Sequence, residues 1–200
     1  ITHYLDLEKR YLEDAGGGLF FFPYKTPTDF TNFAQELRLS GSEGRFRWQT
    51  GLYYLDMTTE TDQSVQGVTI LEGFGATTDS AIQTTNSKLD SSNWSVFGQG
   101  EYDLADQWTL IAGLRWSDDS KKIDLSQVYA ESDAGIAAAE VFNIGDVPID
   151  DIDKIEYDDY AARLQLNYTM DNGTLLYGSW NRGIKGGNWS IDPLGVVALV

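Results

Sequence analysis

The sequence contains no cysteine and only one histidine, His3, among its 200 residues. The lack of cysteine excludes disulfides, thiolate metal sites and cysteine nucleophiles. A single histidine argues against histidine-rich zinc sites and against histidine-based catalytic triads. We therefore expect a protein that is not an enzyme and that carries neither a metal site nor a cofactor.

Positive charge is also scarce. The chain has 14 lysines and arginines against 31 acidic residues, which gives a formal net charge of -17 and a pI near 4.2. Binding to nucleic acid requires a basic surface that neutralises phosphates, and the sequence contains no basic run. We expect no nucleic-acid partner.

Long apolar runs are missing as well, and a run of about 18 such residues is what a membrane-spanning helix requires. A membrane-spanning β-strand alternates apolar and polar residues, so a mean hydropathy of -0.32 does not argue against the membrane. The six tryptophans and eleven tyrosines are typical of the aromatic girdles of such barrels. Composition alone also permits a soluble β-sandwich.

Alternation with a period of two residues is the main pattern that is present. In residues 45–57, Phe46, Trp48 and Leu52 fall on one face of a strand, opposite Arg47 and Gln49. The same pattern recurs in residues 92–102, 108–117 and 160–168, with Phe97 and Ile111 as apolar exceptions on the polar faces, and shorter strands are expected at 1–7, 33–39 and 174–183. Tryptophan or tyrosine marks the ends of these strands about ten residues apart, as a tilted membrane-spanning strand requires.

The connections between these strands alternate in length. Short polar turns are expected at 40–44, 103–107 and 169–173, and long polar segments at about 58–91 and 118–157. An outer loop holding Gly16, Gly17, Gly18 and Phe20 to Phe22 would follow the first strand. Outer-membrane barrels have short periplasmic turns and long extracellular loops, whereas compact soluble domains rarely contain structureless loops beyond about 12 to 15 residues. The sequence thus predicts an all-β, antiparallel transmembrane β-barrel fragment.

Residues 33–51, 94–116 and 177–187, taken in this order, resemble segments of TonB-dependent receptors. The first is FAQELRL at 33–39 followed by the strand with Trp48 and Gly51, and the second is WSVFGQGEY at 94–102 followed by the strand from Trp108 to Trp116. The third, YGSWNRGIKGG at 177–187, resembles the family pattern Y-x-S-x-S-R-G-F-K-x-G-G, with Asn181 and Ile184 as departures.

This resemblance implies a plugged barrel of about 22 strands, of which the chain would supply about seven. Residues 1–200 would form part of the single barrel domain, and because Ile1 follows no export signal, we expect the signal peptide and the plug domain to be absent from this segment. The resemblance further implies a bacterial outer-membrane location, contact with lipid, and uptake of a scarce nutrient powered by the TonB complex through the plug. Ferric siderophore is the expected ligand, since it is the frequent substrate of the family.

Four charged residues are the candidate site. Glu36, Arg38, Arg115 and Arg163 lie on the polar faces of their strands, where they would line the lumen and meet the plug or an anionic ligand. The alternative is ordinary hydrated lining. The acidic run from Asp146 to Asp159 has the oxygen ligands that Ca²⁺ prefers but lacks an EF-hand spacing, so we interpret it as a charged outer loop.

Two other functions share part of this pattern. A passive porin or adhesin barrel would have the same strands without an upstream plug domain. A soluble extracellular β-sandwich that acts as a binding module would need a second sheet to cover its apolar face.

Overall fold

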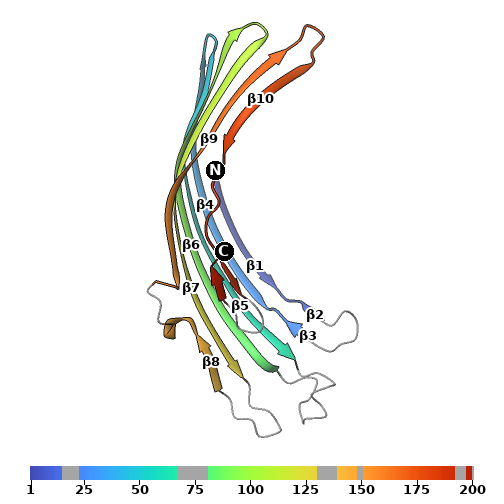
Figure 1. Ribbon diagram of the computed structural model, residues 1–200, viewed down its shortest axis with the longest axis vertical. Coiled ribbons are helices and arrows are strands. Elements are labelled where there is room, and N and C mark those ends of the chain that lie inside the picture. The colour runs from blue at the N-terminus through green and yellow to red at the C-terminus, as the bar shows by residue number, and fades with distance from the viewer. Residues whose placement is uncertain (15–22, 67–80, 130–138, 148–150, 192–196, 200) are drawn as a thin grey trace.

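The computed structural model describes residues 1–14, 23–66, 81–129, 139–147, 151–191 and 197–199, and these form an antiparallel all-β structure. One curved sheet has the strand order β1-β4-β5-β6-β7-β9-β10 (Figure 1). Its strands are β1 (Thr2–Lys9), β4 (Thr28–Glu43), β5 (Phe46–Gln66), β6 (Ala81–Ala105), β7 (Trp108–Tyr129), β9 (Lys154–Thr169) and β10 (Leu175–Arg182). The fold class predicted from the alternation is confirmed.

Short elements accompany this sheet. β2 (Leu12–Asp14), β3 (Pro23–Lys25) and β8 (Ala139–Asn143) extend it at one end, η1 (Ile144–Asp146) is a 3-10 turn, and β11 (Trp189–Ile191) pairs with β12 (Val197–Leu199). No helix among the described residues has the length and apolar character needed to cross a membrane.

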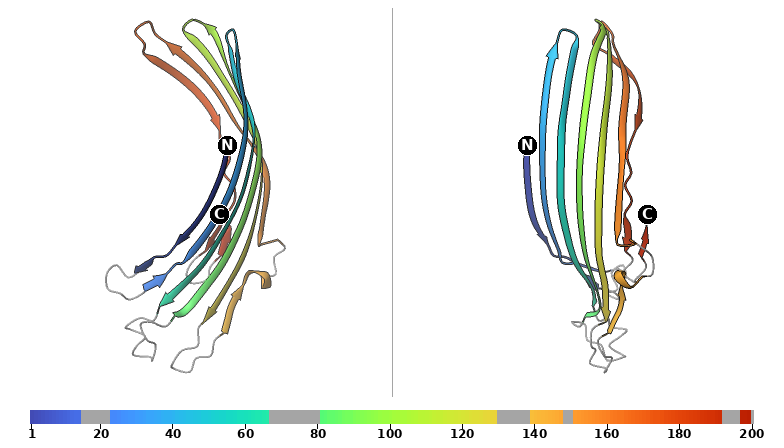
Figure 2. Two further views of the ribbon diagram at one scale, coloured as in Figure 1. Left: turned by 180° about the vertical axis from the view of Figure 1, so that it is seen from behind. Right: turned by 90° about the vertical axis from the view of Figure 1, so that its left-hand side faces the viewer.

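Each long strand pairs antiparallel with the strand that follows it on the path, so the sheet is a continuous meander (Figure 2). The expected short turns join these strands. Gly44 and Gly173 occupy two of them with φ of 59° and 83°, a left-handed conformation that glycine adopts without steric cost. The turns are tighter than predicted at the first two sites, because β4 extends to Glu43 and β6 extends to Ala105.

The strands are also longer than predicted at their other ends. Segments 58–91 and 118–157 were expected to be loops, but β5 and β6 remain paired from Thr58↔Asp90 to Ser64↔Thr84, and β7 and β9 from Asp118↔Asp158 to Lys122↔Lys154. The prediction of long loops is therefore wrong for these residues. Both faces of these extensions carry many polar side chains, so the sequence no longer alternates between apolar and polar residues. The backbone pairing nevertheless continues, and the extensions contain threonines, which favour β-strands. Residues 67–80 and 130–138 and the expected glycine and phenylalanine loop at 16–22 lie outside the described residues.

The convex face of the sheet carries an apolar band. Register aligns one row across five strands, namely Leu37, Leu52, Val96, Trp116 and Tyr160. Four of these side chains are exposed and Trp116 is half-buried; Leu37, for example, is 60% exposed. In the next row outward, Tyr54 and Trp94 align with Asp118 and Asp158. These two carboxylates mark one edge of the apolar band. No second sheet covers this band within the described part of the chain, so a β-sandwich gains no support.

We predict that this segment alone does not form a soluble monomer. β1 and β10 leave two unpaired sheet edges, and the apolar band is open to water, so both favour aggregation. Size-exclusion chromatography of the isolated segment in plain buffer should show aggregates, whereas detergent should disperse them. A monodisperse sample that unfolds cooperatively in buffer would contradict this expectation.

Candidate functional site

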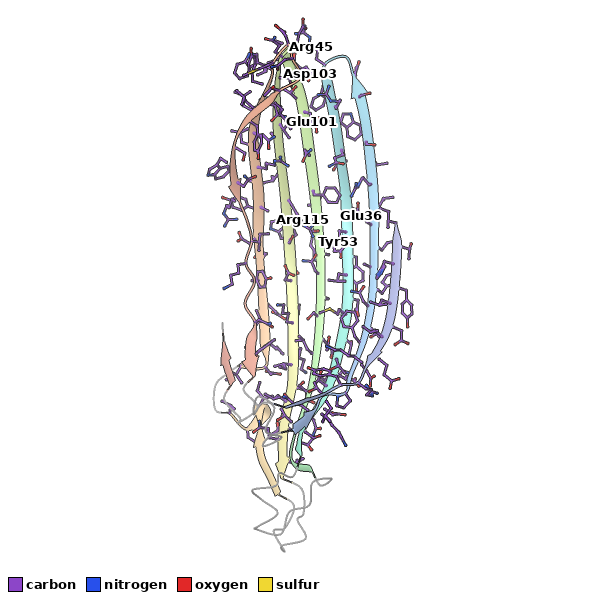
Figure 3. All side chains as sticks on the ribbon, turned by 90° about the vertical axis from the view of Figure 1, so that its right-hand side faces the viewer. Glu36, Arg45, Tyr53, Glu101, Asp103 and Arg115 are labelled. Atoms are coloured by element: carbon purple, nitrogen blue, oxygen red, sulfur yellow. The ribbon has the colours of Figure 1, made fainter. Side chains whose placement is uncertain are left out.

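The concave face carries a hollow of about 680 Å³ that spans β4, β5, β6, β7, β9 and β10 and has both charged and apolar lining residues. All four charged residues predicted from the sequence line it, namely Glu36, Arg38, Arg115 and Arg163. Figure 3 looks at the molecule from this side and labels Glu36, Tyr53 and Arg115 near the middle of the sheet. Residues more than 120 positions apart in the sequence thus meet in one place, since Glu36 and Arg163 share the lining.

Glu36 and Arg38 form an ion pair within β4. They are two residues apart, so both side chains leave the strand on the same face. The Arg38 Nε donates a hydrogen bond of 2.7 Å to the Glu36 carboxylate, and its Nη2 lies 2.5 Å from the same oxygen. The charge of Arg38 is therefore largely balanced inside the site.

Arg115 and Arg163 have polar but uncharged partners. The Arg115 Nε donates to the Ser117 hydroxyl at 3.2 Å, and its guanidinium lies 5.3 Å from the centre of the Tyr53 ring. Arg163 donates to the Gln165 side chain. Among the described residues neither arginine forms an ion pair with a carboxylate, so this part of the chain does not neutralise the two positive charges.

Among the lining residues that were not predicted as site residues, three carry aromatic or charged groups. Tyr53 and Phe97 add aromatic faces, and the Arg38 guanidinium lies 5.9 Å from the Phe97 ring centre. Arg182 adds a fourth guanidinium, which pairs with Asp159 at 2.8 Å. Phe97 did stand out in the sequence as an apolar exception on a polar face, and that irregularity was the available signal. The pairing of Arg182 with Asp159 depends on the β9–β10 register, which the sequence does not specify.

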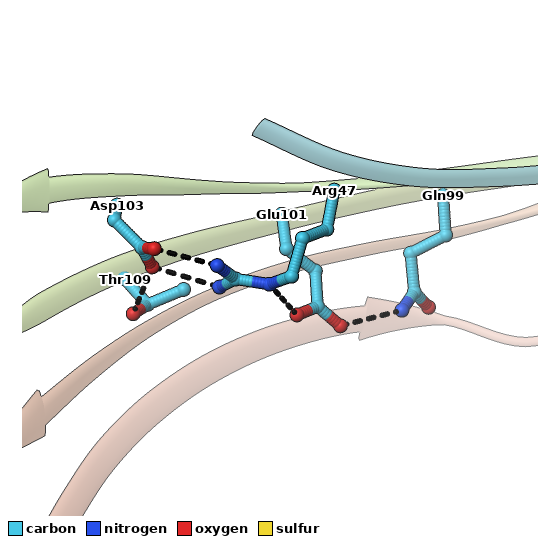
Figure 4. A network of polar contacts seen from close by, with 5 residues as sticks. All are labelled: Arg47, Gln99, Glu101, Asp103 and Thr109. Atoms are coloured by element: carbon cyan, nitrogen blue, oxygen red, sulfur yellow. Dashed lines mark hydrogen bonds and ion pairs between the residues drawn. The ribbon is translucent and has the colours of Figure 1, made fainter. Parts of the chain in front are cut away.

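A second polar network lies nearer the short turns (Figure 4). Arg47 forms a bidentate pair with Asp103, with N–O distances of 2.5 and 2.7 Å, and its Nε donates to Glu101 at 3.3 Å. Thr109 donates to Asp103 at 2.9 Å, and Gln99 donates to Glu101 at 3.3 Å. These hydrogen bonds connect β5, β6 and β7. The charge of Arg47 is neutralised by the carboxylates of Asp103 and Glu101.

The acidic segment at 146–159 is only partly a loop. Glu156 and Asp158 belong to β9 and lie exposed on its convex face, whereas Asp159 lies on the concave face and pairs with Arg182. Asp150 lies outside the described residues. In the described ranges, no three of His, Cys, Asp and Glu lie together in a way that would hold a metal ion. The interpretation of the whole run as a charged outer loop is therefore corrected.

Comparison with known proteins agrees with this architecture. The crystal structure of the ferric yersiniabactin uptake receptor FyuA from Yersinia pestis superposes with a TM-score of 0.67 at 12% sequence identity. The superposition covers 99% of this chain and 27% of that receptor chain, so this chain spans about a quarter of its length. No curated protein matches the sequence. A family profile described as TonB dependent receptor-like, beta-barrel matches residues 2–195. The chain therefore belongs to the TonB-dependent receptor-like β-barrel family.

Proposed function

We propose that this chain is part of the wall of a bacterial outer-membrane receptor that imports a scarce anionic nutrient, with ferric siderophore as the ligand. The observation that carries the proposal is the charge of the hollow. Four arginines and one glutamate line it in a chain whose formal net charge is -17. After the Arg38–Glu36 and Arg182–Asp159 pairs are counted, Arg115 and Arg163 remain as two cations without an ion-pair partner among the described residues.

Unpaired guanidinium groups favour an anion with several oxygen atoms. A guanidinium presents a rigid fork of donors that matches carboxylates and similar oxygen groups, and it also stacks on aromatic faces. Tyr53 and Phe97 supply such faces within the same hollow. The combination fits a ligand with anionic oxygens and flat unsaturated groups. Transport would draw its energy from the TonB complex through a plug domain.

Deletion of the intact gene tests the class of transport. We expect loss of uptake of one ⁵⁵Fe-labelled ferric siderophore among a panel of hydroxamate, catecholate and phenolate complexes, with no change in the flux of small neutral sugars. The reason is that a plugged barrel binds one ligand and leaves no open pore. A passive porin gives the reverse pattern, namely reduced sugar flux with normal growth under iron limitation.

Neutralising the two unpaired arginines tests the site. Arg115→Gln and Arg163→Gln in the full-length receptor should each weaken ligand binding by about 1.5 to 3 kcal/mol, because each removes a charge-assisted hydrogen bond. The measurement is equilibrium binding of the transported ⁵⁵Fe complex to whole cells.

The matched control is Arg45→Gln, which removes an equal charge in the exposed turn between β4 and β5, outside the hollow. It should leave the affinity unchanged. An equal loss in all three variants would mean that net charge alone matters, and no loss at Arg115 or Arg163 would reject the hollow as the ligand site.

A further inference from the structure

The segment that follows β10 leaves the sheet. β10 pairs with β9 as far as Arg182↔Ala162, and residues 183–188 have no strand pairing before β11 begins at Trp189. In Figures 1 and 2 this part of the chain runs beside β9, on the concave side of the sheet. We call residues 183–189 the strap. Residues 183–187 of the strap are the end of the motif YGSWNRGIKGG, and the hollow alone does not explain them.

Contacts along the strap hold it against the wall. The Lys121 Nζ donates a hydrogen bond of 2.9 Å to the Gly187 carbonyl. Gly187 lies against Ile155, where an added Cβ would be 3.5 Å from the nearest methyl carbon. At Gly186 an added Cβ would overlap the hydroxyl of Tyr157. The two glycines therefore allow a close approach between the strap backbone and side chains of β9.

Trp189 anchors the outer end of the strap. It is 7% exposed and packs with Ile123, Leu125 and Ile144 in a buried apolar cluster. Its indole Nε1 donates to the Ile152 carbonyl at 2.8 Å, which satisfies the polar atom of the ring. Ile123 and Leu125 lie on the concave face of β7, beyond the level of the hollow. The side chains of Ile123 and Leu125 thus have an apolar partner in Trp189.

The inner end of the strap belongs to the hollow. Asn181, Arg182 and Gly183 all contribute to its lining. We propose that the strap is a fixed part of the lumen wall that narrows the outer approach to the hollow and limits the size of the molecules that reach it. This inference builds on the proposed function of the hollow, and it assigns Trp189 and Lys121 as positioning residues. The contacts favour a fixed element, since Gly187 is hydrogen-bonded to Lys121, Trp189 is packed at the outer end, and Arg182, just before the strap, pairs with Asp159.

Thiol labelling in intact cells tests this size limit. The full-length receptor, with any cysteine elsewhere replaced by serine, carries Ala161→Cys as a reporter in the hollow. A small methanethiosulfonate and a maleimide attached to polyethylene glycol are added from outside, and the labelling rates are compared. Trp189→Ala and Lys121→Met should each speed labelling by the bulky reagent several-fold and change the rate of the small reagent little.

Two further variants complete the design. Asp124→Ala, an exposed position next to Ile123 on the opposite face, should leave both rates unchanged. A disulfide between Ile155→Cys and Gly187→Cys should also leave both rates unchanged, because it locks a strap that is already in place; an added Cβ at position 187 lies 3.5 Å from a methyl carbon of Ile155. If Trp189→Ala fails to reach the membrane, Lys121→Met and the disulfide variant still test whether the strap limits access to the hollow.

If Trp189→Ala and Lys121→Met both leave the rate of labelling by the bulky reagent unchanged, the proposal is overturned, because the strap then does not limit access. A disulfide that alters either labelling rate would also overturn it, because the strap would have to move. Labelling does not depend on transport. A receptor that shows the expected labelling pattern but imports none of the ferric complexes would therefore reject the proposed function and leave the strap intact as a barrier.

Discussion

Leu164→Arg in the full-length receptor is expected to lower the free energy of unfolding by about 2 to 4 kcal/mol if the position lies near the middle of the bilayer. Leu164 lies on the convex face of β9, is 50% exposed, and aligns with Ala112 and Trp180 in the apolar band. The guanidinium would have to leave water for hydrocarbon. Urea unfolding of the barrel in lipid vesicles measures the change.

The control is the neighbouring position on the other face. Gln165 is 8% exposed, donates to Asn167 and accepts a hydrogen bond from Arg163. Gln165→Arg places a second cation near Arg163, but the polar concave face can hydrate it, so the loss should be far smaller. A soluble protein with a buried core would also show some difference between these two variants.

Accessibility to lipid removes that ambiguity. A spin label at position 164 should be relaxed by oxygen dissolved in the membrane, and a label at 165 by a water-soluble nickel complex. The two faces of β9 would then be assigned directly. Swapped accessibilities, or two labels that both report water, would contradict the placement of the convex face in lipid.

Gly51→Ala is the second substitution with a large expected effect. Gly51 aligns with Arg38 in β4 and with Phe97 in β6, and it lies between Gln49 and Tyr53, which line the hollow. An added Cβ would lie 2.5 Å from the Leu37 carbonyl oxygen and 2.6 Å from the Phe97 ring. Since the oxygen belongs to the backbone, the strands must move apart. We expect a loss of about 1 to 3 kcal/mol, the usual cost of overpacking.

Gly113→Ala provides a matched control on the same face. An added Cβ there would meet its nearest neighbours, atoms of Gln99 and Gly98, at 3.7 Å, which is ordinary van der Waals contact. This variant should change stability by less than about 0.5 kcal/mol. The same urea unfolding assay compares the two. Equal stabilities for both variants would mean that Phe97 does not pack over Gly51 in the membrane.

Alternation predicted the strands because one face of each must meet an apolar surface and the other a polar one. That constraint acts on every second residue, so it identified the parity of Leu164 and Gln165 without any knowledge of neighbours. It failed beyond Tyr54 and Trp94, where both faces of the sheet become largely polar. There the backbone ladder continues without a hydropathy signal, and the strands were mistaken for loops.

The candidate site was likewise predicted only in part from the sequence. The sequence placed Glu36, Arg38, Arg115 and Arg163 on polar faces by counting along single strands, and the structure places all four in one hollow. Their roles in binding remain a prediction. In the part of the chain that the structure describes, Arg115 and Arg163 have no carboxylate partner, while Arg182 pairs with Asp159. This difference could not be predicted, because ion pairs depend on strand register.

The amino-acid sequence by itself determined the antiparallel strands, the glycine turns and the two unlike faces, since these arise from local conformational preference and from alternation between adjacent residues. Only the tertiary structure decided how far the strands extend, which charges neutralise one another, and that Trp189 packs against Ile123 and Leu125 to fix the strap. The physical reason is that these features depend on contacts between residues distant in the sequence, whose geometry is set by the register and curvature of the whole sheet.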